Sequence, residues 1–309
     1  MKVVVIGGGT GLYTLLSGLK NFNFDISAIV ATSDSGGSSG ILRDEYGILP
    51  PGDIRRCLAA LSESEQLLRK LFEHRFSKGG LKGHSFGNLL ITALTEITGS
   101  FEEAVQEAAK ILAVKGKVLP CTLDNVSLCA ELENGKILKN QVEVETFRLT
   151  HNTRIKRLFL EPEARAYGPA LDAIREADLI ILGPGSLFSS VLANLLIKEI
   201  PAAIRNSKAK KVYVVNIMTE HGETDGFTAS QHVKEVERYL KGKLDYVVVN
   251  TVKAPEGLLQ KYEEEYKTQV KTDVENINAN VIKGDFLRKE NLLRHDSYKL
   301  AEAIAKLGK

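Results

Sequence analysis

Five consecutive small residues near the N-terminus form the first group that could bind a ligand. Residues 7–11 read Gly-Gly-Gly-Thr-Gly and stand between a short apolar run and a helical pattern. Glycine lets the backbone approach a ligand closely, and the free N–H groups at a helix N-terminus attract anions. The loop follows the dinucleotide-binding fingerprint only in part, because Leu12 occupies the third glycine position. A tight turn is the simpler alternative, but four glycines in five positions are more than a turn needs, so we favour phosphate binding. The residues proposed to bind the phosphate are Gly8, Gly9, Thr10 and Gly11.

A second loop, rich in glycine and serine, follows the next apolar run. Its sequence, residues 34–40, is Asp-Ser-Gly-Gly-Ser-Ser-Gly, and Arg43 comes shortly after it. Asp34 stands where a dinucleotide-binding dehydrogenase usually has the acid that holds the ribose. The loop and the Arg43 guanidinium could hold a second phosphate, although a flexible exposed loop has the same composition. The candidates here are Asp34, Ser35, Gly37, Ser38 and Arg43.

Two more polar turns are expected at the same edge of a sheet. Residues 182–190, Leu-Gly-Pro-Gly-Ser-Leu-Phe-Ser-Ser, again join an apolar run to a helix, which Ser186 could cap. A polar loop that begins at Asn216 leads to residues 222–228, where Thr228 could cap the next helix. Because the carboxyl ends of parallel strands meet at one edge, these turns predict one large polar cleft. The candidates added here are Gly183, Gly185, Ser186 and Thr219.

Asp53 and the two arginines after it begin another predicted helix. Asp53 could simply be the helix N-cap. Arg55 and Arg56, however, are cations in a first helical turn, where they oppose the helix dipole. That misfit makes either arginine a candidate for binding phosphate or carboxylate, and Asp53 and Arg56 are retained as site residues.

Asn88 and Asp124 are two further polar candidates. Asn88 stands about one turn inside a helix that His84 or Ser85 could cap, and asparagine there needs a partner such as a ligand or a metal-bound water. Asp124 follows a predicted strand and fits either a turn or an oxygen ligand of Mg²⁺.

A parallel sheet is needed to bring these turns together, and the sequence predicts one. Apolar runs rich in valine and isoleucine are each followed by small or polar residues and a helical pattern, as in βα units. The predicted strands are Lys2–Ile6, Ile26–Ala31, Leu179–Leu182, Val212–Val215, Tyr246–Val249 and, near the end of the chain, Asn280–Ile282. We therefore expect an α/β fold with helices covering a mainly parallel sheet.

The middle of the chain has a different pattern. Its predicted helices are Ile54–Leu61, Glu65–His74, Phe86–Ile97 and Phe101–Leu112, and its predicted strands are Val118–Leu123, Ser127–Leu132 and Ile137–Leu138. Asn134-Gly135 favours a hairpin turn between the last two strands. We interpret this stretch as a helical cap and a small β excursion, inserted at about 53–145 into a single domain of residues 1–309 that closes with a helix from Ser297.

Composition and charge argue against several classes of protein. The chain has 309 residues, and its formal net charge of +2 gives no sign of a general nucleic-acid binder. Three cysteines without a Cys-x-x-Cys pair favour reduced thiols over disulfides or a zinc site. No signal peptide and no apolar run of the ~20 residues that span a bilayer is recognisable, so we expect a cytoplasmic protein without a membrane span. The motifs of P-loop NTPases, zincins and α/β-hydrolases are absent from the sequence.

The polar blocks, taken in order along the chain, resemble a known family. They are Gly7–Gly11, Thr32–Gly40, Pro50–Arg56, Gly83–Ile91, Cys121–Leu128, Leu182–Leu196 and Asn216–Val233. These blocks are similar to those of the gluconeogenesis factor family (YvcK-like), in the superfamily of 2-phospho-L-lactate transferase (CofD-like). The resemblance implies a Rossmann-like three-layer α/β/α sandwich with a CofD-like fold.

The resemblance also implies a function. Members of this branch bind UDP sugars such as UDP-N-acetylglucosamine and act in gluconeogenic growth and in cell-shape or cell-wall control. The segment from Arg294 to Ser297 resembles a family block in which the arginine is associated with nucleotide-sugar binding and the hydroxyl residue with regulatory phosphorylation. Ser297 could also cap the last helix. A regulatory kinase, protein partners and a homo-oligomer are expected in addition.

Three functions therefore stay open. A nucleotide-sugar sensor explains several phosphate-binding turns without an evident base or nucleophile. A Mg²⁺-dependent transferase, as in the 2-phospho-L-lactate transferase relatives, would use acidic loop residues, for which Asp34 and Asp124 are the metal candidates. An NAD-dependent dehydrogenase comes third, because the loops could bind NAD although no hydride-transfer residue is identifiable.

Overall fold

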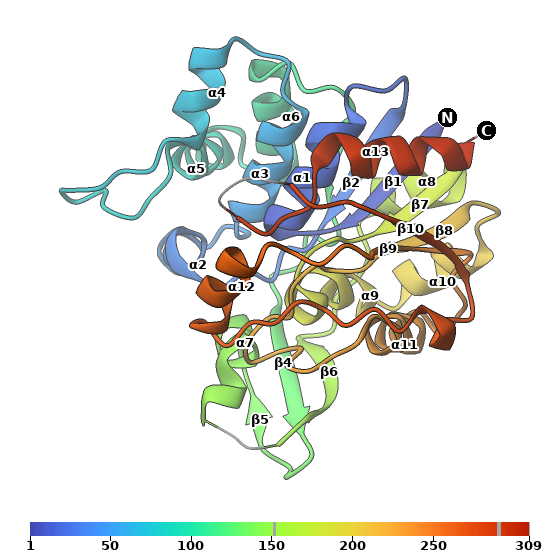
Figure 1. Cartoon of the computed structure of the whole chain (residues 1–309). Helices are drawn as coiled ribbons and strands as arrows, with labels where there is room; N and C mark the ends of the chain where they lie inside the picture. Colours follow the sequence, from blue (N-terminus) through green and yellow to red (C-terminus); the bar gives the residue numbers. More distant parts are fainter. Residues whose placement is uncertain (151–152, 289–291, 309) are drawn as a thin grey trace.

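The computed structural model describes residues 1–150, 153–288 and 292–308, and a sheet of seven parallel strands lies at its centre (Figure 1). In spatial order the strands are β10 (Asn280–Gly284), β9 (Tyr246–Asn250), β8 (Lys210–Val214), β7 (Leu179–Leu182), β1 (Lys2–Gly7), β2 (Asp25–Val30) and β3 (Lys117–Pro120). Every pair of neighbours is parallel. The strands predicted from the apolar runs are thereby confirmed, and their carboxyl ends share one edge of the sheet.

The strand order reverses near the centre of this sheet. From β1 the chain moves outwards through β2 to β3, whereas β7 lies on the other side of β1 and is followed outwards by β8, β9 and β10. Ile6 of β1 is paired with Ile29 of β2 and with Leu182 of β7. The helices after β1 and β7 go to opposite faces of the sheet, and such a switch point is where open α/β sheets bind ligands.

One face of the sheet is covered by helices from both ends of the chain. They are α1 (Gly9–Leu19), α3 (Gly52–Leu61), α4 (Gln66–Glu73), α5 (Phe86–Thr98), α6 (Phe101–Ile111) and α13 (Ser297–Ala305). Val3 and Val5 of β1 pack into this layer, while Val4 and Ile6 pack into the opposite one, because successive strand residues face opposite sides. The helices predicted between positions 54 and 112 are confirmed.

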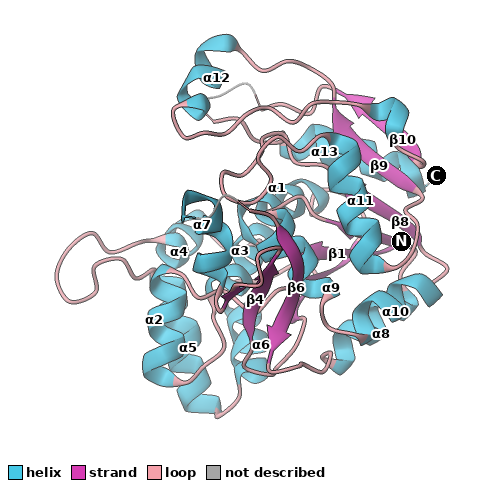
Figure 2. Ribbon diagram, turned by 90° about the horizontal axis from the view of Figure 1, so that it is seen from below, coloured by secondary structure: helices cyan, strands magenta, loops and turns pink. Residues whose placement is uncertain are grey.

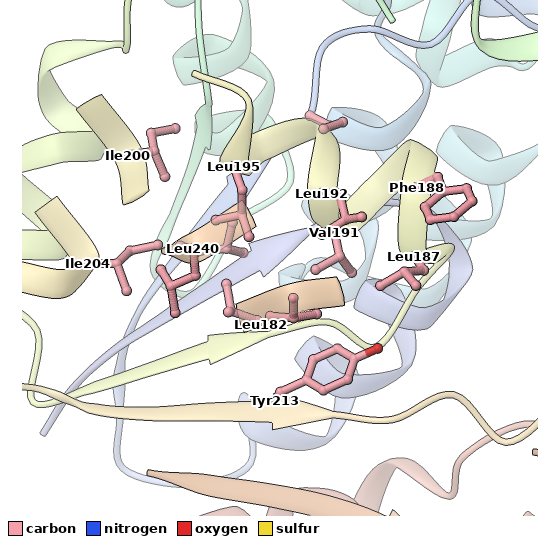
Figure 3. Close-up of a cluster of buried hydrophobic side chains, with 14 of the residues drawn as sticks. Leu182, Leu187, Phe188, Val191, Leu192, Leu195, Ile200, Ile204, Tyr213 and Leu240 are labelled. Atoms are coloured by element: carbon pink, nitrogen blue, oxygen red, sulfur yellow. The ribbon is translucent and has the colours of Figure 1, made fainter. Parts of the chain in front are cut away.

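The other face is covered by helices from the second half of the chain. They are α8 (Gly168–Glu176), α10 (Glu199–Asn206), α11 (Ala229–Leu240) and a π-helix, η1 (Leu187–Leu192), that continues into α9 (Ala193–Leu195). Figure 3 shows how Val191, Leu195 and Ile204 fill the space above β7. The three-layer α/β/α architecture is thus confirmed.

A small antiparallel sheet lies below the main one in Figure 1. It consists of β5 (Ile137–Leu138), β4 (Ser127–Leu132) and β6 (Ile155–Glu161), with α7 (Gln141–Thr150) before β6. The hairpin predicted at Asn134-Gly135 is present, and Gly135 has a φ of 85° there. β6 was not predicted, since its residues are mostly half-buried or exposed and show no clear alternation. β3, which was predicted with the β excursion, pairs instead with β2 in the main sheet.

The second glycine loop is more ordered than its composition suggests. From Gly37 onwards it forms α2 (Gly37–Tyr46), which packs beside α5 (Figure 2), so the alternative of a flexible loop is wrong for this part. A Cβ at Gly40 would collide with the backbone of Ser35, which explains a glycine inside this helix. The remaining short elements are α12 (Glu256–Glu263) and two 3₁₀ turns, η2 (Val274–Asn276) and η3 (Lys306–Gly308).

No single helix in the described part of the chain has both the length and the apolar composition to cross a membrane. Leu187–Leu195 and Glu199–Asn206 would meet these criteria only as a pair, and they are bent by 76° relative to each other.

Candidate ligand-binding site

The glycine turns at the switch point meet around a polar cavity of about 580 Å³. Its walls come from the loops after β1, β2, β7 and β8, from α3 and α5, and from the segment before α13. Most of the residues selected from the sequence line it; they are Gly9, Thr10, Gly11, Asp34, Gly37, Ser38, Asp53, Arg56, Asn88, Gly185, Ser186, Thr219 and Arg294. The structure therefore brings together residues that are up to 285 positions apart, from Gly9 to Arg294.

Five selected residues are not in the cavity lining. Gly8 packs against the lining residues Asp53 and Ser190, Gly183 packs against Val214 and Val191, and the Ser35 hydroxyl is buried without a hydrogen-bond partner among the described residues. Arg43 is directed elsewhere, because its Nη2 donates to the Ser127 hydroxyl on β4 at 3.2 Å. Asp124 is held by a distant segment of the chain, since its Oδ2 accepts the backbone N–H of Arg165 at 2.7 Å. The expectation that the side chains of Arg43 and Asp124 reach the cavity is therefore wrong.

The glycines of the first loop are required by contacts between loops as well as by the turn. A Cβ at Gly8 would collide with the Asp53 carboxylate, and a Cβ at Gly11 would lie 2.6 Å from the Pro184 carbonyl oxygen. Gly9 has a φ of 67°, a conformation that disfavours other residues. The first and third glycine turns can therefore pack closely only because these positions lack side chains.

Replacing Gly11 with alanine is expected to lower the free energy of unfolding by about 1–3 kcal/mol, since a methyl group would push the two loops apart. Ligand affinity should fall with it, because both loops line the cavity. Urea unfolding and ligand titration would measure the two effects. Gly257→Ala in α12 is the matched control: nothing lies within 4 Å of its Cβ, so no loss of stability is expected. Equal behaviour of the two variants would contradict the packing argument.

Asp53 connects the first loop to α3. It is not the N-cap that the sequence suggested, because Pro51 occupies that position and Asp53 lies in the first turn. Its Oδ1 accepts a hydrogen bond from Arg56 Nη1 at 2.9 Å. Burial is the main cause that raises the pKa of Asp53 to about 6, and Asp34 raises it further, while Arg56 and the Gly9 N–H oppose the shift. A carboxyl group with this pKa is close to titration at neutral pH.

Arg55 and Asn88 form a buried network with the second loop. Arg55 Nε donates to Asn88 Oδ1 at 2.9 Å, and Asn88 Nδ2 donates to the Ser38 hydroxyl at 3.0 Å. The Nδ1 atom of His84 is also 3.0 Å from that hydroxyl. Asn88 thus has protein partners within the helix layer, and because it also lines the cavity, a contact with a ligand stays a prediction; Ser85 caps α5. Burial lowers the pKa of Arg55 to about 10, so it is still a cation at neutral pH.

Two residues that the sequence did not single out fix the third loop. Asn216, two residues after the end of β8, binds both backbone groups of Gly185: its Oδ1 accepts the N–H at 3.2 Å and its Nδ2 donates to the carbonyl at 2.8 Å. Ser186 caps η1, as predicted, and its hydroxyl lies 2.6 and 2.8 Å from the carboxyl oxygens of buried Glu223. Asn216 and Glu223 both lie in the polar loop between β8 and α11, and a polar loop directly after a buried strand is the sequence signal that could have identified them.

The segment before α13 closes the cavity from the other side. Arg294 is exposed and lines the cavity beside His295, which is buried. Burial lowers the pKa of His295 to about 4, so its imidazole is neutral, and its Nε2 has no hydrogen-bond partner among the described residues. Ser297 is half-buried but does not cap the helix as expected; Asp296 does, by accepting the N–H groups of Tyr298 and Lys299.

The cavity is lined by more basic than acidic side chains. Its cations are Arg55, Arg56, Arg75, Lys267 and Arg294, and its acids are Asp34, Asp53, Glu145 and Glu220. Such a site, with backbone N–H groups from glycine turns, suits an anion that also carries hydroxyl groups. Within the described ranges no cluster of three or more His, Cys, Asp or Glu could hold a metal by itself. Asp34 and Asp53 supply carboxylate oxygens at the cavity, which would suit Mg²⁺ only together with ligand phosphates.

Comparisons with known proteins agree with this architecture. The family model described as 2-phospho-L-lactate transferase CofD matches residues 3–287. The gluconeogenesis factor of Bacillus subtilis is 46% identical over 313 residues, which cover 99% of this chain and 98% of that protein. That of Halalkalibacterium halodurans is 45% identical over 310 residues, covering 98% and 95%. A crystal structure of a UPF0052-family protein from Bacillus halodurans superposes with a TM-score of 0.93 at 44% identity, covering 98% of both chains. The chain therefore belongs to the CofD family, in which its close relatives are gluconeogenesis factors.

Proposed function

We propose that this protein is a cytosolic regulatory protein that binds a nucleotide sugar of the UDP-N-acetylglucosamine type. The observation that carries the proposal is the cavity at the switch point, where glycine turns and cationic side chains surround one polar space. A diphosphate is the part of a nucleotide sugar that such turns and cations suit best. The hydroxyl-rich sugar and ribose would find hydrogen-bonding partners in the remaining polar lining.

Each part of the proposed ligand has a candidate partner. The N-terminus of α1 and the guanidinium groups of Arg56 and Arg294 would hold the phosphates. The carboxylate of Asp34, which follows β2, would accept hydroxyl groups of the ribose, as an acid at this place does in related nucleotide-binding folds. Binding by position and charge alone needs no nucleophile or general base, which is why a sensor is the reading we prefer.

The relatives suggest the process in which such a sensor acts. The matched proteins of Bacillus subtilis and Halalkalibacterium halodurans are gluconeogenesis factors, and we extend a role in gluconeogenic growth, with cell-shape and cell-wall control, to this chain. Ser297 would be its phosphorylation site: it is the first residue of α13, where the helix N-terminus favours a phosphate. A regulatory kinase belongs to this proposal.

A Mg²⁺-dependent transferase acting on a phosphorylated or nucleotide-linked substrate is the second candidate. The family model named after 2-phospho-L-lactate transferase favours it. Asp34 and Asp53 would hold the metal with the ligand phosphates, and Mg²⁺ would neutralise phosphate charge. Asp124, the other metal candidate, is outside the cavity lining and is not part of this proposal.

Calorimetric titration separates the two candidates. The purified protein is titrated with UDP-N-acetylglucosamine, NAD and a deazaflavin alcohol, each with and without Mg²⁺, and the ligands are recovered afterwards. Metal-independent binding of the UDP sugar, recovered unchanged, is the expected result. Metal-dependent binding of the deazaflavin, or consumption of any ligand, would overturn the sensor in favour of the transferase, and binding of NAD alone would contradict both.

A further inference from the structure

A second cavity, of about 320 Å³, lies on the other side of the Ser186–Glu223 contact. Glu223 belongs to its lining, whereas Ser186 belongs to the lining of the first cavity, so the two spaces are separated by this pair of residues. The second cavity is formed by α7, η1, the loop before α11, α11 itself and the start of β6. The first two glycine loops contribute nothing to it, whereas the turn at 182–190 contributes Phe188 and the turn at 222–228 contributes Glu223, Asp225, Gly226 and Phe227.

Aromatic rings from four places in the chain form its walls. They are Phe147 on α7, Phe188 on η1, Phe227 before α11 and Tyr239 on α11. Figure 3 shows Phe188 at the edge of the buried core, beyond Leu187 and Val191. Phe188 and Phe227 meet edge to face, with centroids 6.4 Å apart and an interplanar angle of 86°. The Tyr239 hydroxyl accepts the Leu158 N–H at 2.8 Å. The walls are therefore held in place without a ligand.

In this cavity the acidic side chains have hydrogen-bond or ion-pair partners, whereas two of the basic side chains have no ion-pair partner among the described residues. Its acids already have partners: Glu223 is bonded by Ser186, Asp225 by His221 and the Gly222 N–H, and Glu235 by Arg238. Its other cations, Arg154 and Lys234, form no ion pair with any described residue. Anions are consequently attracted to the space, while no free carboxylate there attracts a cation.

From these two features we infer that the second cavity is a binding site for a small planar anion, an aromatic ring that carries a carboxylate, sulfonate or phosphate group. Rigid aromatic walls bind a flat ring by stacking or edge-to-face contact. The anionic group would then lie near Arg154 and Lys234 at the mouth, where charge-assisted hydrogen bonds are available. A volume of about 320 Å³ suits a ligand of one or two rings. This site is independent of the nucleotide-sugar site proposed above.

A fluorescent naphthalene sulfonate, anilinonaphthalene sulfonate, is a suitable probe, because the chain has no tryptophan to interfere with its emission. We expect saturable binding at one site per chain. Lys234→Glu and Arg154→Glu should each raise its Kd about tenfold, as expected for a lost charge-assisted contact. Phe227→Ala should weaken binding as well, and circular dichroism would verify that this variant is folded.

Two control variants locate the probe. Lys208→Glu changes an exposed lysine elsewhere on the surface and should leave the Kd unchanged. Arg294→Ala removes a cation of the first cavity and should leave it unchanged too. The inference is overturned if Arg294→Ala weakens probe binding while Lys234→Glu and Arg154→Glu do not, or if all the charge variants bind alike. The two glutamate substitutions are at exposed positions, so the test does not depend on whether Phe227→Ala folds.

Discussion

Replacing Arg294 with alanine is expected to raise the Kd for UDP-N-acetylglucosamine roughly tenfold to a hundredfold. Hydrogen bonds to charged groups contribute about 1.5–3 kcal/mol, and each 1.4 kcal/mol is a factor of ten in affinity. Arg294 lines the first cavity, and its side chain is exposed. Its backbone is held independently of that side chain, since its N–H donates to Leu292 and its carbonyl accepts from Arg288. Calorimetry would measure the loss, and the melting temperature should stay the same.

Two further variants make the result specific. Arg43→Ala is the control, because Arg43 stands in the second glycine loop by sequence but contacts Ser127 outside the cavity lining. The Kd of this variant should stay within about twofold of the wild type, since the contact that is lost, with the Ser127 hydroxyl, lies outside the cavity lining. Arg294→Lys keeps the charge but loses the planar fork of the guanidinium and should give an intermediate Kd. Similar values for Arg294→Ala and Arg43→Ala would remove Arg294 from the binding site.

The sheet and its helices were predictable because their signals are local. A buried parallel strand shows itself as a short run of valine and isoleucine, and the predicted strand Leu179–Leu182 agrees with β7 residue for residue. The helix predicted at Phe86–Ile97 differs from α5 by one residue at its end. β6 itself buries only Leu158 fully, so its sequence lacks the alternation on which such a prediction depends.

For the cavity, the sequence predicted which loops meet, because strand topology determines that, but it did not predict which side chains point into the space. Turns at the carboxyl ends of parallel strands must meet, and that rule placed Gly9, Asp34 and Ser186 together correctly. It cannot say in which direction a side chain leaves its turn. Arg43 is in the last turn of α2, and that position directs it to β4 and away from the cavity.

The glycines illustrate why function and packing are hard to separate from sequence alone. Gly11 was selected because a phosphate could approach it, yet the Pro184 carbonyl already occupies the space next to it. Gly8 is likewise in contact with Asp53, which is 45 positions away. Contacts over such separations depend on the complete fold. A glycine-rich turn in a sequence is therefore compatible both with phosphate binding and with close packing against another loop.

Glu223 is expected to make the protein less stable as the pH rises from 6.5 to 8. Burial raises its pKa from an ordinary value of 4.5 to about 8, with Glu145 and Glu220 adding to the shift, while Ser186 and the Phe188 N–H oppose it. In this window the folded state holds a proton that the unfolded state has lost, so the free energy of unfolding falls as pH rises. Each pH unit changes it by at most about 1.4 kcal/mol, which gives a loss of roughly 1–2 kcal/mol.

The window from pH 6.5 to 8 isolates this group from two others with large shifts. The pKa of Asp53 is about 6 in the folded protein, so most of its contribution lies below this range. His295, with a pKa lowered to about 4, acts in the opposite direction: the unfolded state binds the proton first, so stability rises with pH up to about 6.5 and is constant above. Burial also raises the pKa of Glu220, which acts in the same direction as Glu223, so a Glu223 variant is needed to assign a decline above pH 6.5.

Glu223→Gln tests the assignment, because glutamine has the same shape and can still accept hydrogen bonds from the Ser186 hydroxyl and the Phe188 N–H. Urea unfolding at pH 6.5 and pH 8 should show no decline for this variant, and it should be more stable than the wild type at pH 8. Glu163→Gln, at an exposed ion pair with Lys198, should keep the decline of the wild type. If Glu223→Gln declines as steeply, Glu223 is already ionised in the folded protein, and Ser186 then donates to a full negative charge between the two cavities.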